Sequence, residues 1–295
     1  MSETFPYAFI RGEITPIENA TISIQSKVVQ YGLGCYTGLR AHWDGENLYL
    51  FRLEDHFARL QNASKLLGMH FLYDFEKFRT TILELIKKNG AEEDIYLRIT
   101  LYCASTKLTP RFNNPDDDLA IYLISLKDYF DSNKALNIGI TKYIRIDNDM
   151  MPIEAKTTGS YINSALAKSD ALSQGYDECL FLNRQGHVCE ASGANIFAIQ
   201  KNKAITPPLT DNILNGITRD TIITILKDEL NIPTEERTIL PEELTEFEEL
   251  FFTGTAAKIT AIATVDKKSL LKSDYPTIKK LQALLDSLFR NKMPK

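Results

Sequence analysis

The chain has 295 residues, 44% of them hydrophobic, and a formal net charge of −5. This length can bury a full core and favours two domains over one, so a soluble globular protein is expected. Acidic and basic residues are interleaved and their sum is negative, which argues against nucleic acid or an anionic membrane surface as a partner.

Targeting and metal-binding signals are absent from the sequence. The N-terminal residues MSETFPYAFIRGE lack the basic start and apolar run of a signal peptide, and no stretch approaches the roughly 18 apolar residues of a membrane span. The expected location is the cytoplasm. The four cysteines are widely spaced and the four histidines show no metal-ligand spacing, so we expect buried thiols and predict neither disulfides nor a metal site.

The first part of the chain combines strand and helix patterns. Apolar alternation and short apolar runs predict strands at 7–14, 20–26, 94–103 and 118–126. Apolar residues at helical spacing predict helices over 53–67 and 75–89. The apolar signal then drops over 127–137. We therefore expect a small N-terminal domain at 1–127, a linker at 128–137 and a large C-terminal domain at 138–295.

The second part begins with a strand pattern at 137–146 and continues with a helix that ends at Gly175. The apolar face expected for that helix contains Tyr161, Ile162, Ala165, Leu166, Ser169 and Leu172. A hairpin is expected to turn at 184–186. A second helix should start near Thr218 and Asp220, which would cap it and place a negative charge at its start. An amphipathic helix is expected at the end of the sequence. Strands and helices without regular βαβ alternation predict an α+β fold.

The familiar nucleotide signatures are absent, because GLGCYTG lacks the GxGxxG spacing and no GxxxxGK[ST] occurs. Four other pieces suit a pyridoxal phosphate site. Lys156 precedes a flexible turn and could form a Schiff base, and Glu190 could pair with the pyridine nitrogen. The helix start NGITRD and the turn TGTAA could offer backbone amides to a phosphate. Each piece alone also fits an ordinary role as a surface lysine, a hairpin carboxylate, a capped helix or a turn.

Longer motifs carry a resemblance to a known family. EAKTTGSYINSALAKSDALSQGYDECLFLN, EASGANIF, TPPLTDNILNGITRDTI and FFTGTAA are similar to the fold-type IV pyridoxal phosphate enzymes, and most closely to the branched-chain amino acid aminotransferases. YGLGCYTGLRAH, LFRLEDHFARLQNASKLLGM and IYLRITLY extend the similarity to the N-terminal half. The resemblance implies a two-domain, D-amino acid aminotransferase-like architecture, and an active site completed by a neighbouring subunit in a homodimer or larger homo-oligomer.

The resemblance also implies roles for individual residues. Lys156 takes the place of the Schiff-base lysine, Tyr161 that of the tyrosine on the cofactor's phenolic oxygen, and Glu190 that of the pyridine partner. The remaining positions match the family's phosphate contacts: Arg59, Ile217, Thr218 and Thr255. Positions that match the substrate pocket are Tyr31, Tyr36, Arg40, Tyr96, Arg98, Gly254, Thr255 and Ala256.

Two positions depart from the usual motifs of this family. Thr37 stands in YTGLR where glutamate is common, and Ala194 stands in SGAN where GEN is common. Neither position is expected to carry cofactor chemistry, but the lost carboxylate would change hydrogen bonds near the substrate pocket.

The resemblance implies transfer of the amino group from branched-chain L-amino acids to 2-oxoglutarate. Within the same fold, the alternatives are a D-amino acid transaminase, an (R)-amine transaminase and aminodeoxychorismate lyase, and Tyr96 with Arg98 favours the branched-chain enzyme. A non-catalytic binding protein with a decayed site is the alternative from another class.

Overall fold

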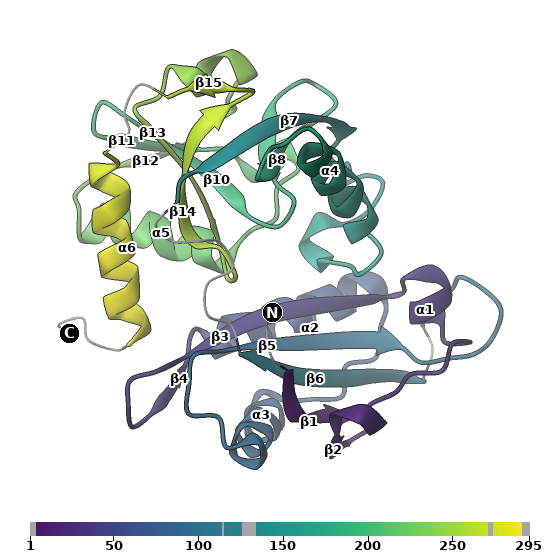
Figure 1. Cartoon of the computed structure of the whole chain (residues 1–295). Coiled ribbons are helices and arrows are strands. Elements are labelled where there is room, and N and C mark those ends of the chain that lie inside the picture. Colours follow the sequence, from purple (N-terminus) through teal and green to yellow (C-terminus); the bar gives the residue numbers. More distant parts are fainter. Residues whose placement is uncertain (1–3, 114, 126–133, 271–273, 291–295) are drawn as a thin grey trace. The chain divides into compact units, whose positions relative to one another are not determined.

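The computed structural model describes residues 4–113, 115–125, 134–270 and 274–290. These form two compact units, both drawn in Figure 1. The first unit contains residues 1–127 together with 154–159, and the second contains 128–153 and 160–295. The short segment 154–159 therefore packs with the first unit although its sequence neighbours belong to the second.

The first unit is an antiparallel sheet with helices. Its six strands have the order β2-β1-β6-β5-β3-β4. They are β1 (Thr4–Ile10), β2 (Glu13–Pro16), β3 (Gly34–Trp43), β4 (Leu48–Leu50), β5 (Ile95–Cys103) and β6 (Asp117–Ser125). The helices are the short α1 (Lys27–Tyr31), then α2 (Leu53–Leu67) and α3 (Phe75–Asn89), with a 3-10 turn at Ile17–Asn19.

Helix α3 begins at a side-chain cap, and both α2 and α3 end at a glycine. The Asp74 carboxylate accepts a 2.8 Å hydrogen bond from the Lys77 backbone N–H and so starts α3. Gly68 and Gly90 follow the two helices with φ values of 63° and 58°, a left-handed conformation that glycine adopts without a steric penalty.

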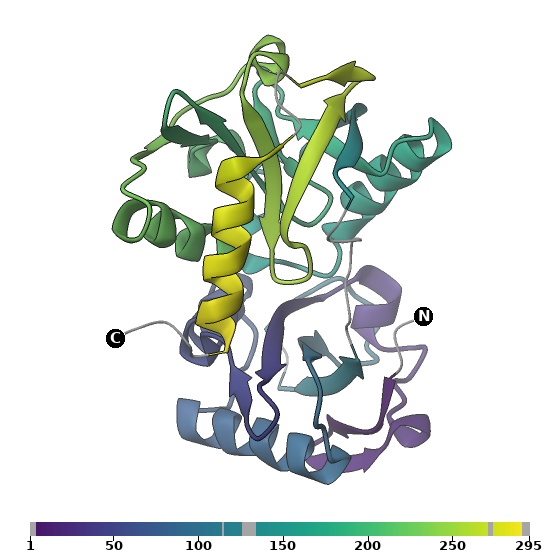
Figure 2. The same cartoon turned by 60° about the vertical axis from the view of Figure 1, so that its left-hand side comes forward.

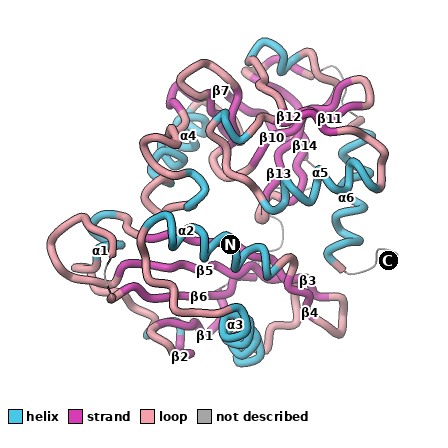
Figure 3. Tube along the Cα trace, turned by 180° about the vertical axis from the view of Figure 1, so that it is seen from behind, coloured by secondary structure: helices cyan, strands magenta, loops and turns pink. Residues whose placement is uncertain are grey.

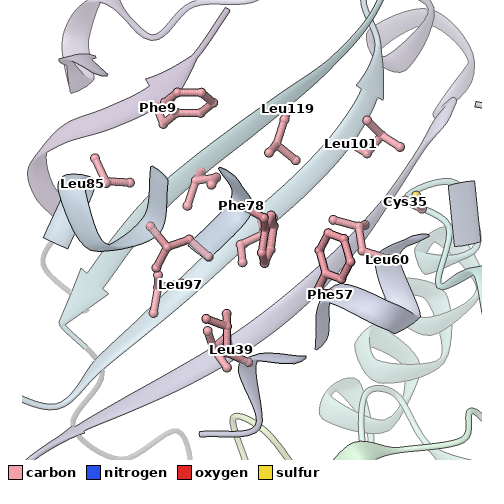
Figure 4. Packing of buried hydrophobic residues seen from close by; sticks show 14 of the residues in the cluster. Phe9, Cys35, Leu39, Phe57, Leu60, Phe78, Leu85, Leu97, Leu101 and Leu119 are labelled. Carbon is pink, nitrogen blue, oxygen red and sulfur yellow. The ribbon is translucent and has the colours of Figure 1, made fainter. Parts of the chain in front are cut away.

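The two faces of this sheet carry different sets of residues, because successive side chains of a strand point to opposite faces. One face packs on α2 and α3 and forms the core. Figure 4 shows this packing for Phe57 and Leu60 of α2, Phe78 and Leu85 of α3, and Leu39, Leu97, Leu101 and Leu119 of the strands. The alternate residues of β3 and β5 point to the other face, and they include Tyr36, Arg40, Tyr96 and Arg98.

The second unit is built on a mixed nine-stranded sheet. Its strands are β7 (Leu136–Ile144), β8 (Glu178–Leu182), β9 (Val188–Ala191), β10 (Asn195–Gln200), β11 (Lys203–Thr206), β12 (Thr234–Glu236), β13 (Glu249–Gly254), β14 (Lys258–Val265) and β15 (Lys268–Ser269). The path β10-β13-β14-β7-β8-β9 returns to β10, because Glu190 of β9 pairs with Asn195 of β10. These strands therefore form a closed ring around a hydrophobic core.

Three helices cover this ring. Helix α4 (Tyr161–Ser173) packs on β7 and β8, while α5 (Ile217–Asp228) and α6 (Pro276–Phe289) pack on each other and on β13. Figure 2 shows α6 along β14, and Figure 3 shows α5 and α6 as neighbours. The carboxylate of Glu249 fixes the start of α6, since it accepts hydrogen bonds of 3.1 and 3.0 Å from the backbone N–H groups of Thr277 and Ile278. Short 3-10 turns lie at Ile153–Ala155, Leu209–Asp211 and Pro241–Thr245.

The α+β prediction is confirmed, and helices α2 and α3 have the predicted bounds. Four local predictions are wrong. The strand predicted at 7–14 is instead a hairpin, because β1 and β2 pair and the chain turns at Arg11 and Gly12. Residues 20–26 form no strand, and Ile22 and Ile24 are exposed. The N-cap of α5 is Gly216 and not Thr218, which lies inside the helix. Most of the expected apolar face of α4 is exposed, because the buried face consists of Ser164, Ala167 and Ala171, small residues that let the helix lie close to the strands.

The predicted linker 128–137 lies mostly outside the described residues, and β7 already starts at Leu136. The four cysteines are free and buried, and burial raises the pKa of the Cys35 thiol to about 12. Within the described ranges, no helix is long and apolar enough to cross a membrane. Among those same residues, no group of His, Cys, Asp or Glu side chains is arranged to hold a metal ion.

Candidate active site

The predicted site residues fall into two sets, one in each unit. In the first unit, the segment that carries Lys156 runs beside the start of β3. Tyr36 N–H donates to the Lys156 carbonyl at 3.2 Å, Thr158 N–H donates to the Gly34 carbonyl at 2.9 Å, and Thr157 forms an antiparallel bridge with Cys35. The Thr158 hydroxyl also donates to the Gly32 carbonyl at 2.6 Å. Hydrogen bonds at the Lys156 carbonyl and at Thr158 thus hold this backbone in place.

Lys156 has a backbone conformation that is rare for a residue with a side chain. Its φ is 44°, in the left-handed region, which costs a non-glycine residue about 1–3 kcal/mol. Its Nζ lies 5.0 Å from the centre of the Tyr36 ring, over the ring face. The side chain is half-buried. The fold therefore fixes one amine over an aromatic surface at the expense of local backbone strain.

Four predicted pocket residues share the sheet face opposite to α2 and α3. Arg40 lies opposite Tyr96, and Arg98 lies opposite Gly38, where the missing side chain leaves space for the Tyr96 ring. The Arg98 guanidinium lies 4.2 Å from the centre of the Tyr36 ring and 5.4 Å from that of Tyr96. Burial raises the pKa of the Tyr96 phenol, so this ring is neutral near pH 7.

The fifth predicted pocket residue of this unit, Tyr31, is the half-buried last residue of α1. Gly32 follows it with a φ of 68° and lies so close to Gly159 that an added Cβ would be 3.0 Å from the Gly159 Cα. This contact between two glycines places the end of α1 beside the lysine segment.

Arg59 projects from α2 toward β3. Its Nη2 donates to the Thr37 hydroxyl at 2.8 Å, and the same hydroxyl lies 2.7 Å from Nδ1 of His56. Burial lowers the pKa of the His56 imidazole well below its ordinary value, and the positive charges of Arg59, Arg52 and Lys156 lower it further. His56 is therefore neutral at pH 7 and can accept a hydrogen bond.

In the second unit, Glu190 is buried in the strand ring and is held by three donors. Oε1 accepts a 2.6 Å hydrogen bond from Nη2 of Arg145, which makes an ion pair. Oε2 accepts hydrogen bonds from the Asn195 side-chain amide at 3.0 Å and from the Leu214 backbone N–H at 3.1 Å. Donors of this kind stabilise the ionised form of a buried carboxylate.

The start of α5 lies next to this carboxylate. Gly216 is the N-cap residue and provides no side-chain cap, and Ile217 and Thr218 form the first turn. A Cβ at position 216 would collide with the Asn195 Oδ1, whose amide nitrogen bonds Glu190 and the Leu214 carbonyl. Asn195 thus connects the carboxylate to the helix terminus, which is a favourable place for an anion.

The remaining predicted residues of the second unit lie at element ends. Tyr161 is the first residue of α4 and is half-buried. Gly254 ends β13, and Thr255 and Ala256 form the turn into β14. Ala194 contacts this turn, because a Cβ added to Gly254 would lie 3.6 Å from the Ala194 Cβ. A small residue at 194 therefore suits the close approach of the two turns.

Sequence reasoning missed His56, Arg145 and Asn195, and it singled out Thr37 without its contact to Arg59. The spacing of His56 and Arg59 places them on one side of a helix, and this was a readable signal. The partnership of Arg145 with Glu190 links residues 45 positions apart, and the sequence contains no signal for it.

The donor set fits a phosphate-bearing aldehyde cofactor. In the first unit, one amine has a strained backbone and one arginine is of the kind that binds phosphate. In the second unit, a helix start without a side-chain cap suits an anion, and a buried carboxylate with several donors suits a cationic ring. Donors of these kinds are the ones that a pyridoxal phosphate enzyme needs.

Comparison with known proteins agrees with this class. Residues 34–265 match the family described as Amino-transferase class IV. A probable branched-chain-amino-acid aminotransferase of Aquifex aeolicus (strain VF5) is 38% identical, over 99% of this chain and 95% of that protein. The chain therefore belongs to the class IV aminotransferases.

Two solved structures are similar over their full length. The branched-chain aminotransferase of Thermoproteus uzoniensis, crystallised with norvaline, has a TM-score of 0.93 and 36% identity, with 98% of this chain and 96% of that chain covered. The branched-chain amino acid aminotransferase of Thermobaculum terrenum in its PLP form has a TM-score of 0.92 and 28% identity, with 99% and 96% covered.

Proposed function

We propose that this aminotransferase uses pyridoxal phosphate to transfer the amino group of leucine, isoleucine or valine to 2-oxoglutarate, giving the branched 2-oxo acid and glutamate. The names of the relatives support the substrate class. The observation that carries the proposal is Lys156, which alone among the lysines of the described residues combines a left-handed backbone with a position over an aromatic ring.

The residues that would hold pyridoxal phosphate come from both sets. Arg59, Ile217, Thr218 and Thr255 are assigned to the phosphate, Tyr161 to the phenolic oxygen, Glu190 to the ring nitrogen and Lys156 to the aldehyde carbon. When bound, the cofactor supplies a carbonyl that takes up the amino group and a ring that withdraws electrons.

Two residues then act on protons. The Lys156 amine takes the proton from the substrate Cα as a general base and returns it as a general acid. The Glu190 carboxylate, whose ionised form is stabilised by its donors, would keep a proton on the ring nitrogen, because a nearby negative charge favours the cationic form of that nitrogen.

The substrate would be selected by the aromatic and cationic groups of the first unit and by one turn of the second. Tyr31, Tyr36 and Tyr96 offer apolar ring faces to a branched side chain, while their hydroxyls, with Arg40 and Arg98, can bind the second carboxylate of glutamate. The backbone N–H groups at Gly254, Thr255 and Ala256 are assigned to the α-carboxylate.

A half-reaction panel tests the substrate class. The purified enzyme in its aldehyde form, mixed with L-leucine, L-valine, D-alanine or (R)-1-phenylethylamine, should convert to the amine form fastest with the two L-amino acids, as followed by absorbance. Faster conversion with D-alanine or the (R)-amine would replace the proposal by the corresponding transaminase. Turnover of aminodeoxychorismate without reaction of valine would make the chain a lyase, and a protein that stays colourless with added pyridoxal phosphate would be a binding protein.

We also propose a homodimer, supported by an exposed apolar stripe on α4. Ile162, Leu166 and Leu172 are 69%, 47% and 54% exposed, and apolar surface of this kind marks an interaction site when it is contiguous. Residues 1–127 and 138–295 are proposed to be the small and large domains, and the cytoplasm the site of action.

Leu166→Glu should shift the enzyme toward the monomer, because a carboxylate cannot be buried unpaired in an interface. Leu83→Glu is the matched control, since Leu83 lies on helix α3 with a similar exposure of 40%. Light scattering after size exclusion measures both. A mass unchanged in Leu166→Glu, or changed equally in the two variants, would remove α4 from the interface.

A further inference from the structure

Thr37 has an assignable task, although the sequence only marks it as unusual. We propose that its hydroxyl is a positioning group that holds the Arg59 guanidinium in the orientation that binds the cofactor phosphate, with His56 fixing the direction of the hydroxyl. This inference rests on the proposed role of Arg59. Thr37 itself touches neither substrate nor cofactor in this scheme.

The chemistry of the three side chains assigns the donor of each hydrogen bond. A guanidinium is only a donor, so Arg59 Nη2 gives its hydrogen to the Thr37 oxygen at 2.8 Å. The hydroxyl keeps its own hydrogen to donate, and His56 Nδ1 lies 2.7 Å away. We assign Nδ1 as the unprotonated nitrogen of the ring, which accepts this hydrogen. Arg59 Nη2 also lies 3.4 Å from Nδ1, which is consistent with an acceptor at that atom.

Burial keeps His56 neutral and its contact with Thr37 free of competing water. Thr37 on β3 and His56 on α2 are buried, so water cannot readily replace either partner. A protonated His56 would carry hydrogen on Nδ1, so it could no longer accept from the Thr37 hydroxyl and would place a second positive charge beside Arg59. Burial and the adjacent cations oppose that state by lowering the pKa of His56. The neutral imidazole thus holds the hydroxyl, and the hydroxyl holds one amino group of Arg59.

The test compares two ligands that differ only by the phosphate. Full-length apoprotein is titrated with pyridoxal phosphate and with pyridoxal, and both dissociation constants are measured by absorbance. Thr37→Val removes the hydroxyl at nearly constant shape and should weaken pyridoxal phosphate binding about tenfold, the scale of one hydrogen bond to a charged group, while pyridoxal binding stays the same. Thr37→Ser keeps the hydroxyl and should restore most of the affinity for pyridoxal phosphate.

Thr81→Val is the matched control for removing a buried threonine hydroxyl. Thr81 lies on α3, where its hydroxyl donates to the Lys77 carbonyl at 2.8 Å, away from Arg59. This variant should leave both dissociation constants unchanged. If Thr37→Val fails to fold, Thr37→Ala takes its place in the comparison.

A double-mutant cycle tests whether Thr37 changes the affinity for pyridoxal phosphate through Arg59 or through a general effect on the protein. In the Arg59→Gln background, Thr37→Val should have no further effect on pyridoxal phosphate affinity. An equal loss for pyridoxal, or an undiminished loss in the Arg59→Gln background, would overturn the inference. Borohydride labelling of the unsubstituted protein at Lys156 tests the proposed function separately. An unlabelled Lys156 would reject the proposed function, whereas an unaltered affinity in Thr37→Val would reject only the role of Thr37.

Discussion

Lys156→Ala should abolish transamination, with a loss in turnover of about 10⁴-fold or more, because the variant lacks both the attachment point and the general base. The fold should persist, since the backbone hydrogen bonds beside position 156 do not involve the side chain. Steady-state rates with L-leucine and 2-oxoglutarate measure the loss. Borohydride reduction followed by peptide mapping should label the unsubstituted enzyme at Lys156 and leave the variant unlabelled.

Lys142→Ala provides the control for Lys156→Ala. Its ammonium pairs with Asp170 at 2.8 Å while 69% of its side chain is exposed, so its removal should leave the rate unchanged. Full activity in Lys156→Ala, or a label that remains on another peptide, would contradict the assignment of the reactive amine.

Glu190→Gln should lower the turnover number about 100-fold, which corresponds to roughly 2.7 kcal/mol, while the cofactor stays bound. A neutral amide has nearly the shape of the carboxylate but cannot balance a positive ring nitrogen, and it also deprives Arg145 of its counter-charge. Turnover under saturating substrate and the cofactor content by absorbance measure the two parts of this prediction.

Glu178→Gln is the matched control for Glu190→Gln, because Glu178 is also buried and ion-paired, with Lys168 at 2.7 Å. Both variants should unfold at lower temperature than the unsubstituted protein, since each removes the carboxylate charge from an ion pair with a partly buried cation. Only Glu190→Gln should lose turnover per folded molecule. Equal turnover in the two variants would show that Glu190 has a structural role alone.

Much of the fold could be read from local patterns. Apolar residues at helical spacing located α2 and α3 to the residue. Residues 20–26 show the limit of this reasoning. Their apolar alternation predicts a strand, yet this segment pairs with no sheet and Ile22 and Ile24 remain exposed. Alternation states which residues share a face, but whether another strand lies alongside depends on tertiary structure.

Helix α4 shows a second limit. Its larger apolar residues predict one buried face, but the fold buries the side with Ser164, Ala167 and Ala171. Hydrophobicity alone cannot rank the two faces when small residues allow a closer approach to the strands. If the large residues serve another subunit, single-chain patterning cannot distinguish that surface from a core.

Sequence reasoning also reached only part of the candidate site. Motif similarity located the residues assigned to the cofactor, but it did not identify their supports. Thr37 and Arg59 are 22 positions apart, and only the pairing of β3 with its neighbours and the docking of α2 bring them together. The sequence marked Thr37 as a departure affecting the substrate, whereas its hydroxyl bonds Arg59.

The closure of the strand ring through Glu190 and Asn195 has a consequence for how the enzyme is inactivated by stress. Opening the ring at this pair would expose two unpaired strand edges, which are templates for aggregation. The same opening would separate the Glu190 carboxylate from Asn195. Loss of cofactor retention and the onset of aggregation on heating should therefore coincide, and added cofactor should delay both.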